Sequence, residues 1–381
     1  MIQKFKRLII LIRIIFKVIS SGKANKEVLN PKNILIIQTA KMGDMVCTTP
    51  MFRAVKNKFP NSVLTVVGDN LNKEILLGNP DVDNYVIWNK KDPISLIEEI
   101  KKYHFDFACI TAPNFEGLAL LLLSDIKLVV CPKIENGKSP YETRPYRIIR
   151  RFAVTKPHSM GTYAPREYLR LLEPIGIFSE DTKKTLYYSD NAKKRVEEFF
   201  AKNNVEERDF LVGVSPSAGN KIKRWPEEHF AGVADYLKEK YKAKILIFGG
   251  SKDLEEVQNM LKHIKSPDNV INTLGEFNID ELKYAVSKMN LFISVDTGPI
   301  YIAEAFGVPT IDIVGPIDEK EQPPIDDTHI VVVPESKKPE LYVMNARVYD
   351  TQEATRQANS VTVDQVKEAI DLLIPKLNVK R

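Results

Sequence analysis

The pattern of apolar and polar positions predicts a chain of alternating strands and helices. Residues 34–37 (I-L-I-I) form an unbroken apolar run, which is typical of a strand buried on both faces. A polar turn follows at residues 38–44, Thr49-Pro50 predicts a helix start, and residues 62–68 predict the next strand. This βαβ unit predicts a ligand site at the carboxyl end of its first strand.

The same alternation continues to the end of the chain and predicts an α/β protein with doubly wound parallel sheets. A length of 381 residues suits two such domains. We expect one domain over residues 31–180, a second over residues 190–362, and a closing helix over residues 363–375. Residues 135–160 are basic and lack apolar periodicity, which predicts a loop, and residues 342–360 are too weakly patterned to assign.

The N-terminal segment, residues 1–22, predicts a basic amphipathic helix. Its apolar run is interrupted by Lys6, Arg13 and Lys17, which share one side of a helical wheel. Three interpretations follow: a helix lying in a membrane interface, a signal peptide, or a helix packed on the protein's own surface. Arg13 within the apolar run argues against a signal peptide, and we favour the membrane interface.

Composition and charge exclude some classes of function but do not identify one. The net charge of +5 is mild for this length, and no nucleic-acid-binding signature is present. The three cysteines form no C-x-x-C pair, which predicts neither a disulfide framework nor a zinc site and favours a reducing, cytoplasmic compartment.

The second half contains two turns suited to an anion. After the predicted strand at residues 291–295 come Asp296, Thr297 and Gly298, at the start of a helix whose partial positive charge favours anions. Asp296 serves either as a ligand contact or as a cap of this turn. The small-residue loop that contains Ser217 follows another predicted strand, and its backbone N–H groups are able to approach phosphate.

Further candidates flank these turns. The turn G-G-S-K-D after the strand at residues 244–248 places Asp253 where a carboxylate accepts ribose hydroxyls, or where it caps a helix. Trp225 is predicted to be a packing residue. In the first half, Lys41, Arg144 and Arg147 are candidates for an acceptor that carries phosphates or carboxylates, although solvated basic residues are the alternative.

These motifs, in this order, resemble those of the heptosyltransferase family, glycosyltransferase family nine, over roughly residues 31–375. The residues that carry the resemblance are Gly43-Asp44, Thr48-Thr49-Pro50, Phe59-Pro60, His104-Phe105-Asp106, Lys223 with Trp225-Pro226, and the run from Ser294 to Pro309. The resemblance implies a GT-B architecture of two Rossmann-like domains facing a cleft. It also implies that the closing helix crosses back to the first domain.

The resemblance further implies a metal-independent, inverting glycosyltransferase that needs no cofactor. Such an enzyme would move heptose from ADP-heptose to an inner-core sugar of lipopolysaccharide or lipooligosaccharide. Its partners would be a nucleotide-sugar donor, a lipid-linked oligosaccharide acceptor and the inner-leaflet membrane surface, with no nucleic acid. We therefore expect a cytoplasmic protein that is peripheral on the inner face of the cytoplasmic membrane.

The resemblance also assigns roles to residues. Asp44 is the expected catalytic base, against the alternative that it only braces its turn. Lys223, Ser217, Asp253, Asp296, Thr297, Gly298 and Tyr301 are the expected donor-binding residues. Tyr301 stands where the family has histidine, and tyrosine brings no positive charge to a leaving diphosphate. This departure leaves two alternatives open: another nucleotide-hexose donor, or an inactive nucleotide-binding module docked on a membrane.

Overall fold

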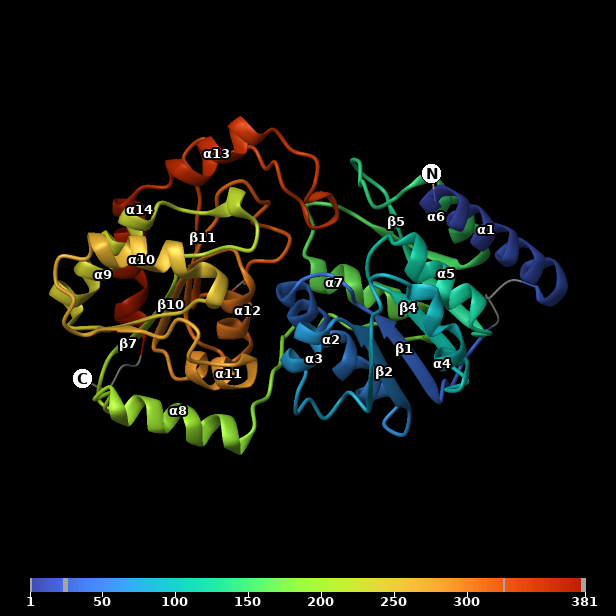
Figure 1. Cartoon of the computed structure of the whole chain (residues 1–381), viewed down its shortest axis with the longest axis horizontal. Helices are drawn as coiled ribbons and strands as arrows, with labels where there is room; N and C mark the ends of the chain where they lie inside the picture. The colour runs from blue at the N-terminus through green and yellow to red at the C-terminus, as the bar shows by residue number, and fades with distance from the viewer. Residues whose placement is uncertain (1, 23–26, 325, 378–381) are drawn as a thin grey trace. The chain divides into compact units, whose positions relative to one another are not determined.

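The first unit of the chain carries a six-stranded parallel sheet in the order β3-β2-β1-β4-β5-β6 (Figure 1). The computed structural model describes residues 2–22, 27–324 and 326–377, and assigns Met1–Lys184 and Val343–Arg347 to this unit. Strand β1 (Asn33–Ile37) pairs with β2 on one side and β4 on the other. The chain therefore reverses its direction of winding between β1 and β4, which is where open α/β sheets bind ligands.

Helices of the first unit form two groups that cover opposite sides of this sheet (Figure 1). Helix α2 contacts α3 and α7, whereas α5 contacts α1, α4 and α6. The strands are β1 (Asn33–Ile37), β2 (Val63–Gly68), β3 (Asn84–Ile87), β4 (Phe107–Ile110), β5 (Leu128–Ile134) and β6 (Val154–His158). The helices are α1 (Ile2–Ser21), α2 (Met42–Lys58), α3 (Asn70–Ile75), α4 (Ile97–Lys101), α5 (Phe115–Leu123), α6 (Arg144–Ile149) and α7 (Ala164–Leu169), with 3₁₀ turns at Pro93–Leu96, Arg150–Phe152 and Arg170–Ile175.

The second unit, Thr185–Tyr342 and Val348–Arg381, carries another six-stranded parallel sheet, in the order β12-β11-β10-β7-β8-β9. Its switch point lies between β7 and β10, which are hydrogen-bonded neighbours. The strands are β7 (Leu211–Ser215), β8 (Lys244–Ile247), β9 (Val270–Asn272), β10 (Leu291–Val295), β11 (Thr310–Ile313) and β12 (His329–Val332). The helices are α8 (Asp190–Lys202), α9 (Glu227–Tyr241), α10 (Leu254–His263), α11 (Ile279–Ser287), α12 (Gly298–Ala305), α13 (Thr351–Ser360) and α14 (Val363–Leu373), with 3₁₀ turns at Lys221–Lys223, Ser251–Asp253 and Ile374–Lys376. Two parallel α/β sheets confirm the predicted fold class.

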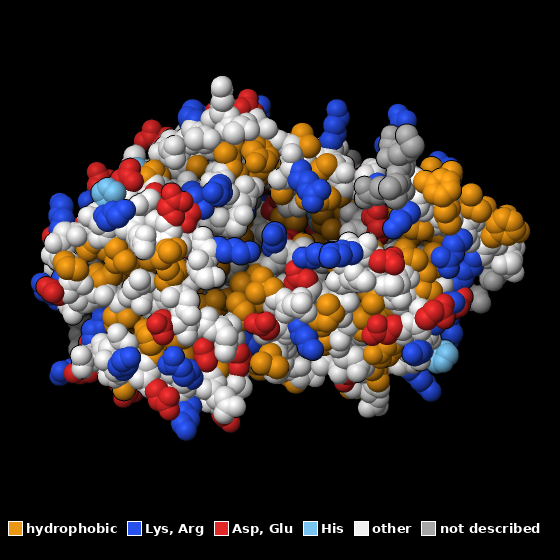
Figure 2. All heavy atoms as spheres, in the orientation of Figure 1, with side chains coloured by type: hydrophobic (Ala, Val, Ile, Leu, Met, Phe, Trp, Pro, Cys, Tyr) orange, Lys and Arg blue, Asp and Glu red, His pale blue; other side chains and the backbone are white. Residues whose placement is uncertain are grey.

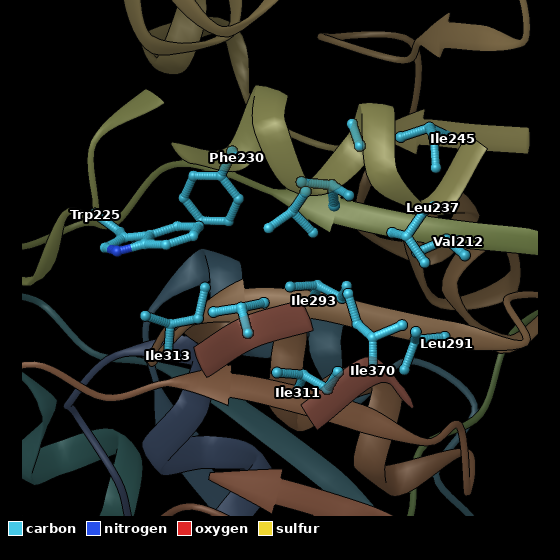
Figure 3. Close-up of a cluster of buried hydrophobic side chains, with 14 of the residues drawn as sticks. Val212, Trp225, Phe230, Leu237, Ile245, Leu291, Ile293, Ile311, Ile313 and Ile370 are labelled. Carbon is cyan, nitrogen blue, oxygen red and sulfur yellow. The ribbon is translucent and has the colours of Figure 1, made fainter. Parts of the chain in front are cut away.

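The core of the second unit lies between its sheet and helices α9 and α14 (Figure 3). Trp225 is 1% exposed and packs edge-on against Phe230, with ring centroids 4.9 Å apart. Its indole Nε1 donates a hydrogen bond to the Val361 carbonyl at 2.8 Å. The prediction that Trp225 is a packing residue is therefore confirmed.

Helix α2 begins earlier than the sequence predicted. It starts at Met42, and Pro50 lies inside it rather than at its first position. Because proline has no N–H, the carbonyl of Val46 loses its usual helical partner. The Thr49 hydroxyl donates to that carbonyl at 2.8 Å, so the helix continues through the proline.

Residues 135–160 were predicted to be a loop, and this prediction is wrong. They contain α6 and the edge strand β6, which pairs in parallel with β5. The strand escaped the apolar pattern because its residues are half-buried, except for His158, and because it contains Pro157. Such an edge strand is held by pairing with its neighbour rather than by burial on both faces.

The closing helix also differs from the expectation. Helix α14 contacts α9, β11 and β12, all in the second unit, so it does not cross back to the first domain. The segment that joins the first unit is instead Val343–Arg347, where Met344 is 1% exposed and the guanidinium of Arg347 lies 5.0 Å from the centre of the Tyr141 ring.

Candidate functional site

The first group of candidate residues lies at the carboxyl end of β1, beside the switch point of the first sheet. Gln38, only 1% exposed, directly follows the strand and holds the turn: its side chain accepts from the Ala40 N–H at 3.0 Å and donates to the Thr48 hydroxyl at 3.0 Å. The turn leads into the first helical turn of α2, which contains Asp44. A buried strand thus delivers Asp44 to the edge where ligands bind.

Asp44 is half-buried and is held from two directions. Its Oδ2 accepts a hydrogen bond from the Lys41 backbone N–H at 3.2 Å, as expected of a residue that braces the helix start. Its Oδ1 accepts a hydrogen bond from the hydroxyl of Tyr168, a residue of α7, with the two oxygens 3.4 Å apart. Sequence reasoning assigned no role to Tyr168, and no local pattern signals a contact across 124 positions. The bracing contact is present, and the catalytic role stays a prediction.

The predicted acceptor residues do not form one cluster with Asp44. Lys41 is exposed at the N-cap of α2, beside Asp44. Arg144 and Arg147 are exposed on α6 and, among the described residues, have no hydrogen bond or ion pair to Asp44. They line a separate open depression over β5, β6 and α6, formed by Lys133, Arg144, Arg147, Ile148, Arg150, Arg151, Ala153 and Thr155.

The predicted donor residues do come together in the second unit. The Asp296 turn follows β10. Thr297 is the N-cap of helix α12 and Gly298 is its first residue, and both residues are half-exposed. Lys223 reaches this turn from 73 positions away: its Nζ forms an ion pair with Asp296 Oδ2 and lies 3.4 Å from the Asp296 carbonyl oxygen. A cation is thereby placed beside a helix N-terminus, which is an arrangement suited to an anionic group.

Tyr301 lies in the first turns of α12 and is 2% exposed. Its hydroxyl donates a hydrogen bond to Asp296 Oδ1, the oxygen that Lys223 does not contact. Asp296 therefore receives a cation on one oxygen and a hydroxyl on the other, and acts as the organising carboxylate of this cluster. These two contacts come from side chains and not from the N–H groups of α12, whose N-cap is Thr297, so the cap and the donor contact of Asp296 both remain predictions.

Ser217 and Asp253 belong to loops at the same sheet edge. Ser217 is 6% exposed, two residues beyond the end of β7. Asp253 follows β8, the neighbour of β7, and its Oδ2 accepts from the Gly250 backbone N–H at 2.8 Å. That bond matches the alternative in which Asp253 caps a helix start; its ribose contact stays a prediction.

Sequence reasoning missed Asp312, which lies in β11 directly opposite Ser294 of β10. The side chain is fully buried, and neither carboxyl oxygen has a hydrogen-bond partner among the described residues. Burial, and secondly the nearby Asp296, hold the pKa of Asp312 well above its ordinary value, while Lys223 and Lys337 act in the opposite direction. Sequence reasoning treated residues 308–314 as an apolar strand and therefore gave no role to the one acid within it.

The candidate metal ligands of the described ranges are acidic, histidine and cysteine side chains that lie close to one another. No group of three or more His, Cys, Asp or Glu side chains is arranged there to hold a metal ion. Asp81 and Asp83 form a D-x-D triplet, a spacing able to hold a cation. Asp83, however, forms an ion pair with Lys56 at 2.6 Å and accepts from the Leu64 N–H at 2.6 Å, so it holds α2 against β2.

Several known proteins with similar sequences are named as heptosyltransferases. The chain is 26% identical to lipopolysaccharide heptosyltransferase 3 of Escherichia coli K12 over 287 residues, which covers 72% of this chain and 80% of that protein. It is 25% identical to lipooligosaccharide heptosyltransferase 2 of Campylobacter jejuni over 283 residues, which covers 72% and 79% of the two chains.

Solved structures share the fold at low identity. The glycosyl transferase family 9 protein of Veillonella parvula matches with a TM-score of 0.73 and 22% identity, over 92% of this chain and 99% of that one. The E. coli ADP-heptose heptosyltransferase II matches with a TM-score of 0.70 and 17% identity, over 90% and 99%. The family model for glycosyltransferase family 9 (heptosyltransferase) matches residues 141–346, more than half of the chain. The chain therefore belongs to glycosyltransferase family 9 and has the GT-B type of fold.

Proposed function

We propose that this glycosyltransferase moves heptose from ADP-heptose to an inner-core sugar of lipopolysaccharide or lipooligosaccharide, with inversion and without a metal. The observation that carries the proposal is the ion pair of Lys223 with Asp296, which places a cation beside the N-terminus of α12. This group is suited to the negative charge that grows on a departing diphosphate. The heptosyltransferases among the relatives support the choice of sugar.

The proposed reaction is a single displacement. The acceptor hydroxyl oxygen forms a bond to the anomeric carbon, and the bond from that carbon to the donor's phosphate oxygen breaks. ADP leaves with the electron pair of the broken bond, beside Lys223, Thr297 and Gly298. Asp44 accepts the proton of the hydroxyl, and Tyr168 and the Lys41 N–H orient its carboxylate.

The acceptor in this proposal is lipid-linked, so the enzyme would work on the inner face of the cytoplasmic membrane. Lys41 lies beside Asp44 and is suited to an acidic group of the acceptor. Arg144 and Arg147 are suited to phosphates farther along the acceptor.

Replacing Asp44 by asparagine tests the catalytic assignment. Asn keeps an oxygen for the Lys41 N–H but accepts no proton, so turnover should fall about a hundredfold or more. The measurement is ADP release on adding a heptose-deficient lipopolysaccharide acceptor, with ADP affinity followed by calorimetry and expected to stay unchanged. The matched control is Asp69→Asn, because the Asp69 carboxylate serves local structure: it caps α3, accepting from the Asn72 N–H at 3.0 Å, and forms an ion pair with Lys90 at 3.1 Å. Near-normal turnover of Asp44→Asn would show that the base is misassigned.

Another nucleotide-hexose donor is the second candidate, and the hydrogen bond from Tyr301 to Asp296 favours it. A tyrosine committed to this carboxylate offers the diphosphate no positive charge. Offering the protein several nucleotide-sugars and measuring nucleotide release on acceptor addition separates the two donors. Binding of a nucleotide-sugar without transfer to any lipopolysaccharide-type acceptor would instead indicate an inactive binding module.

A further inference from the structure

One side of helix α1 packs against the rest of the first unit, where α1 contacts α5 and α6. Ile14 is 1% exposed within the core cluster that also contains α5 residues. Two ion pairs fix the same side: Arg7 to Glu116 at 2.7 Å and Lys17 to Asp125 at 2.5 Å. The third interpretation of the N-terminal segment, a helix on the protein's own surface, is therefore correct for this side of the helix.

The opposite side of α1 is apolar and exposed. Phe16 is 72% exposed and Ile19 is 78% exposed, although both are large apolar residues. Their companions on this side are Phe5, Leu8, Ile9, Ile12 and Ile15, all exposed. At 100° per residue these positions occupy one continuous sector, and apolar side chains gather over α1 in Figure 2. Such a contiguous patch on a folded domain marks an interaction site.

Unpaired cations border this apolar sector. Lys6 and Arg13 are exposed at its edge and, within the described part of the chain, have no ion pair. Helix α6, which contacts α1, exposes Arg144 and Arg147, and the 3₁₀ turn after it exposes Arg151; no carboxylate among the described residues pairs with these three. The surface thus combines apolar insertion with positive charge.

We propose that the exposed sector of α1 and the cations beside it form a docking surface for an anionic lipid bilayer. The helix would lie flat, with its apolar sector in the acyl boundary and its cations at the lipid phosphates. None of the described helices is long and apolar enough to cross a membrane. A second copy is a poorer occupant, because a two-fold contact through this sector would bring the unpaired cations of both chains together. This inference rests on the proposed function for its choice of a membrane partner, but binding to the bilayer does not require the glycosyl transfer reaction.

Vesicle flotation of the full chain tests this surface. We expect the protein to float with vesicles that contain about a third phosphatidylglycerol and to float poorly with phosphatidylcholine alone. The double variant Phe16→Asp and Ile19→Asp should lose flotation at least tenfold. Leu372→Asp is the matched control, because Leu372 is 64% exposed on α14 in the other unit, and it should float like the original chain.

The charge contribution has its own test. Lys6→Gln and Arg13→Gln each remove one positive charge and should each weaken binding to the anionic vesicles about fivefold, which corresponds to about 1 kcal/mol for each basic residue. High salt should reduce binding in the same direction. We expect unchanged melting temperatures, since these side chains have no ion pair among the described residues, and this result shows that the variants are folded.

Two outcomes overturn the proposal. One is equal flotation of the double variant and the original chain. The other is a dimer in solution that Phe16→Asp and Ile19→Asp convert to a monomer, with no binding to vesicles, which would assign the sector to a second copy. ADP release with a detergent-dispersed acceptor, measured in parallel, reports the transfer reaction separately, so loss of docking and failure of the proposed function are distinguishable.

Discussion

The hydroxyl of Tyr301 donates a hydrogen bond to Asp296 Oδ1, and both side chains are almost fully buried. The residue at the family's histidine position is thereby committed to the carboxylate that also holds Lys223. Because Lys223 and Tyr301 share this one carboxylate, we expect removal of one member of the cluster to change the contacts of the others.

The first prediction concerns this hydrogen bond. Tyr301→Phe should weaken ADP binding about tenfold or more, because Asp296 loses a donor and Lys223 shifts toward the freed oxygen. Calorimetric titration with ADP measures the effect. Tyr284→Phe is the matched control: Tyr284 is a buried tyrosine of the same unit and donates to Glu197 Oε1 at 2.7 Å, away from the Asp296 turn. Equal ADP affinities of the two variants would separate Tyr301 from donor binding.

The second prediction concerns the proline within α2. Thr49→Val should lower the free energy of unfolding by about 1–3 kcal/mol, because the Val46 carbonyl that Pro50 leaves unpaired then loses the Thr49 hydroxyl. Adding Pro50→Ala should recover part of this loss, since alanine supplies the missing N–H. Urea denaturation of the two single variants and the double variant measures the coupling.

A second threonine provides the control for α2. The Thr355 hydroxyl donates to the Thr351 carbonyl at 2.8 Å in α13, where the helix already supplies a backbone N–H. Thr355→Val should therefore change stability by less than about 0.5 kcal/mol. Additive effects of Thr49→Val and Pro50→Ala would contradict the proposed repair of the helix.

The third prediction concerns Asp312. Burial of its carboxyl group holds its pKa well above the ordinary value. The unfolded chain releases this proton near pH 4, whereas the folded chain keeps it, so the folded state binds more protons above that pH. The stability that Asp312 contributes is therefore present at low pH and is lost as the pH rises. Asp312→Asn removes this dependence and should become increasingly stabilising, relative to the original chain, from about pH 4 upward.

Urea denaturation across this pH range measures the difference between the two chains. Asp209→Asn serves as a control of opposite sign. Burial raises the pKa of Asp209, but hydrogen bonds from the Glu206 N–H and Lys244 outweigh this effect and hold the pKa below its ordinary value. The stability from Asp209 is present above its ordinary pKa and is lost as the pH falls. Parallel stability curves of the original chain and Asp312→Asn would contradict the buried, protonated acid.

The fourth prediction concerns His158, whose pKa is lowered to about 4, chiefly by burial, which outweighs the opposing Glu167 carboxylate. The ring is neutral in the fold, so its contribution to stability is complete above pH 6.5 and is lost as the pH falls toward about 4. His158→Gln should flatten the decline in this window, where the slope reaches at most about 1.4 kcal/mol per pH unit. His263→Gln, at an exposed position on α10, should leave the decline unchanged.

The sequence by itself determined the elements whose burial is local and continuous. Apolar runs marked β1 and β10 at or within one residue of their bounds. The closing helix predicted over residues 363–375 matches α14 (Val363–Leu373), where the Thr362 side chain caps the Gln365 N–H. The order of these elements predicted both sheets and placed Asp44 and the Asp296 turn at carboxyl strand ends. Such features follow from side-chain period and from caps, which act over a few residues.

Only the tertiary structure decided the features that depend on distant partners. The edge strand β6 is defined by pairing with β5, and α2 runs through Pro50 because a hydroxyl repairs its hydrogen bond. Lys223 and Tyr301 both contact Asp296, and Asp312 is buried with no hydrogen-bond partner among the residues that the structure describes. The division of α1 into a packed and an exposed side likewise depends on which surface the domain offers it. A sequence period reports that a side is apolar, but what covers that side is settled by contacts between segments far apart in the chain.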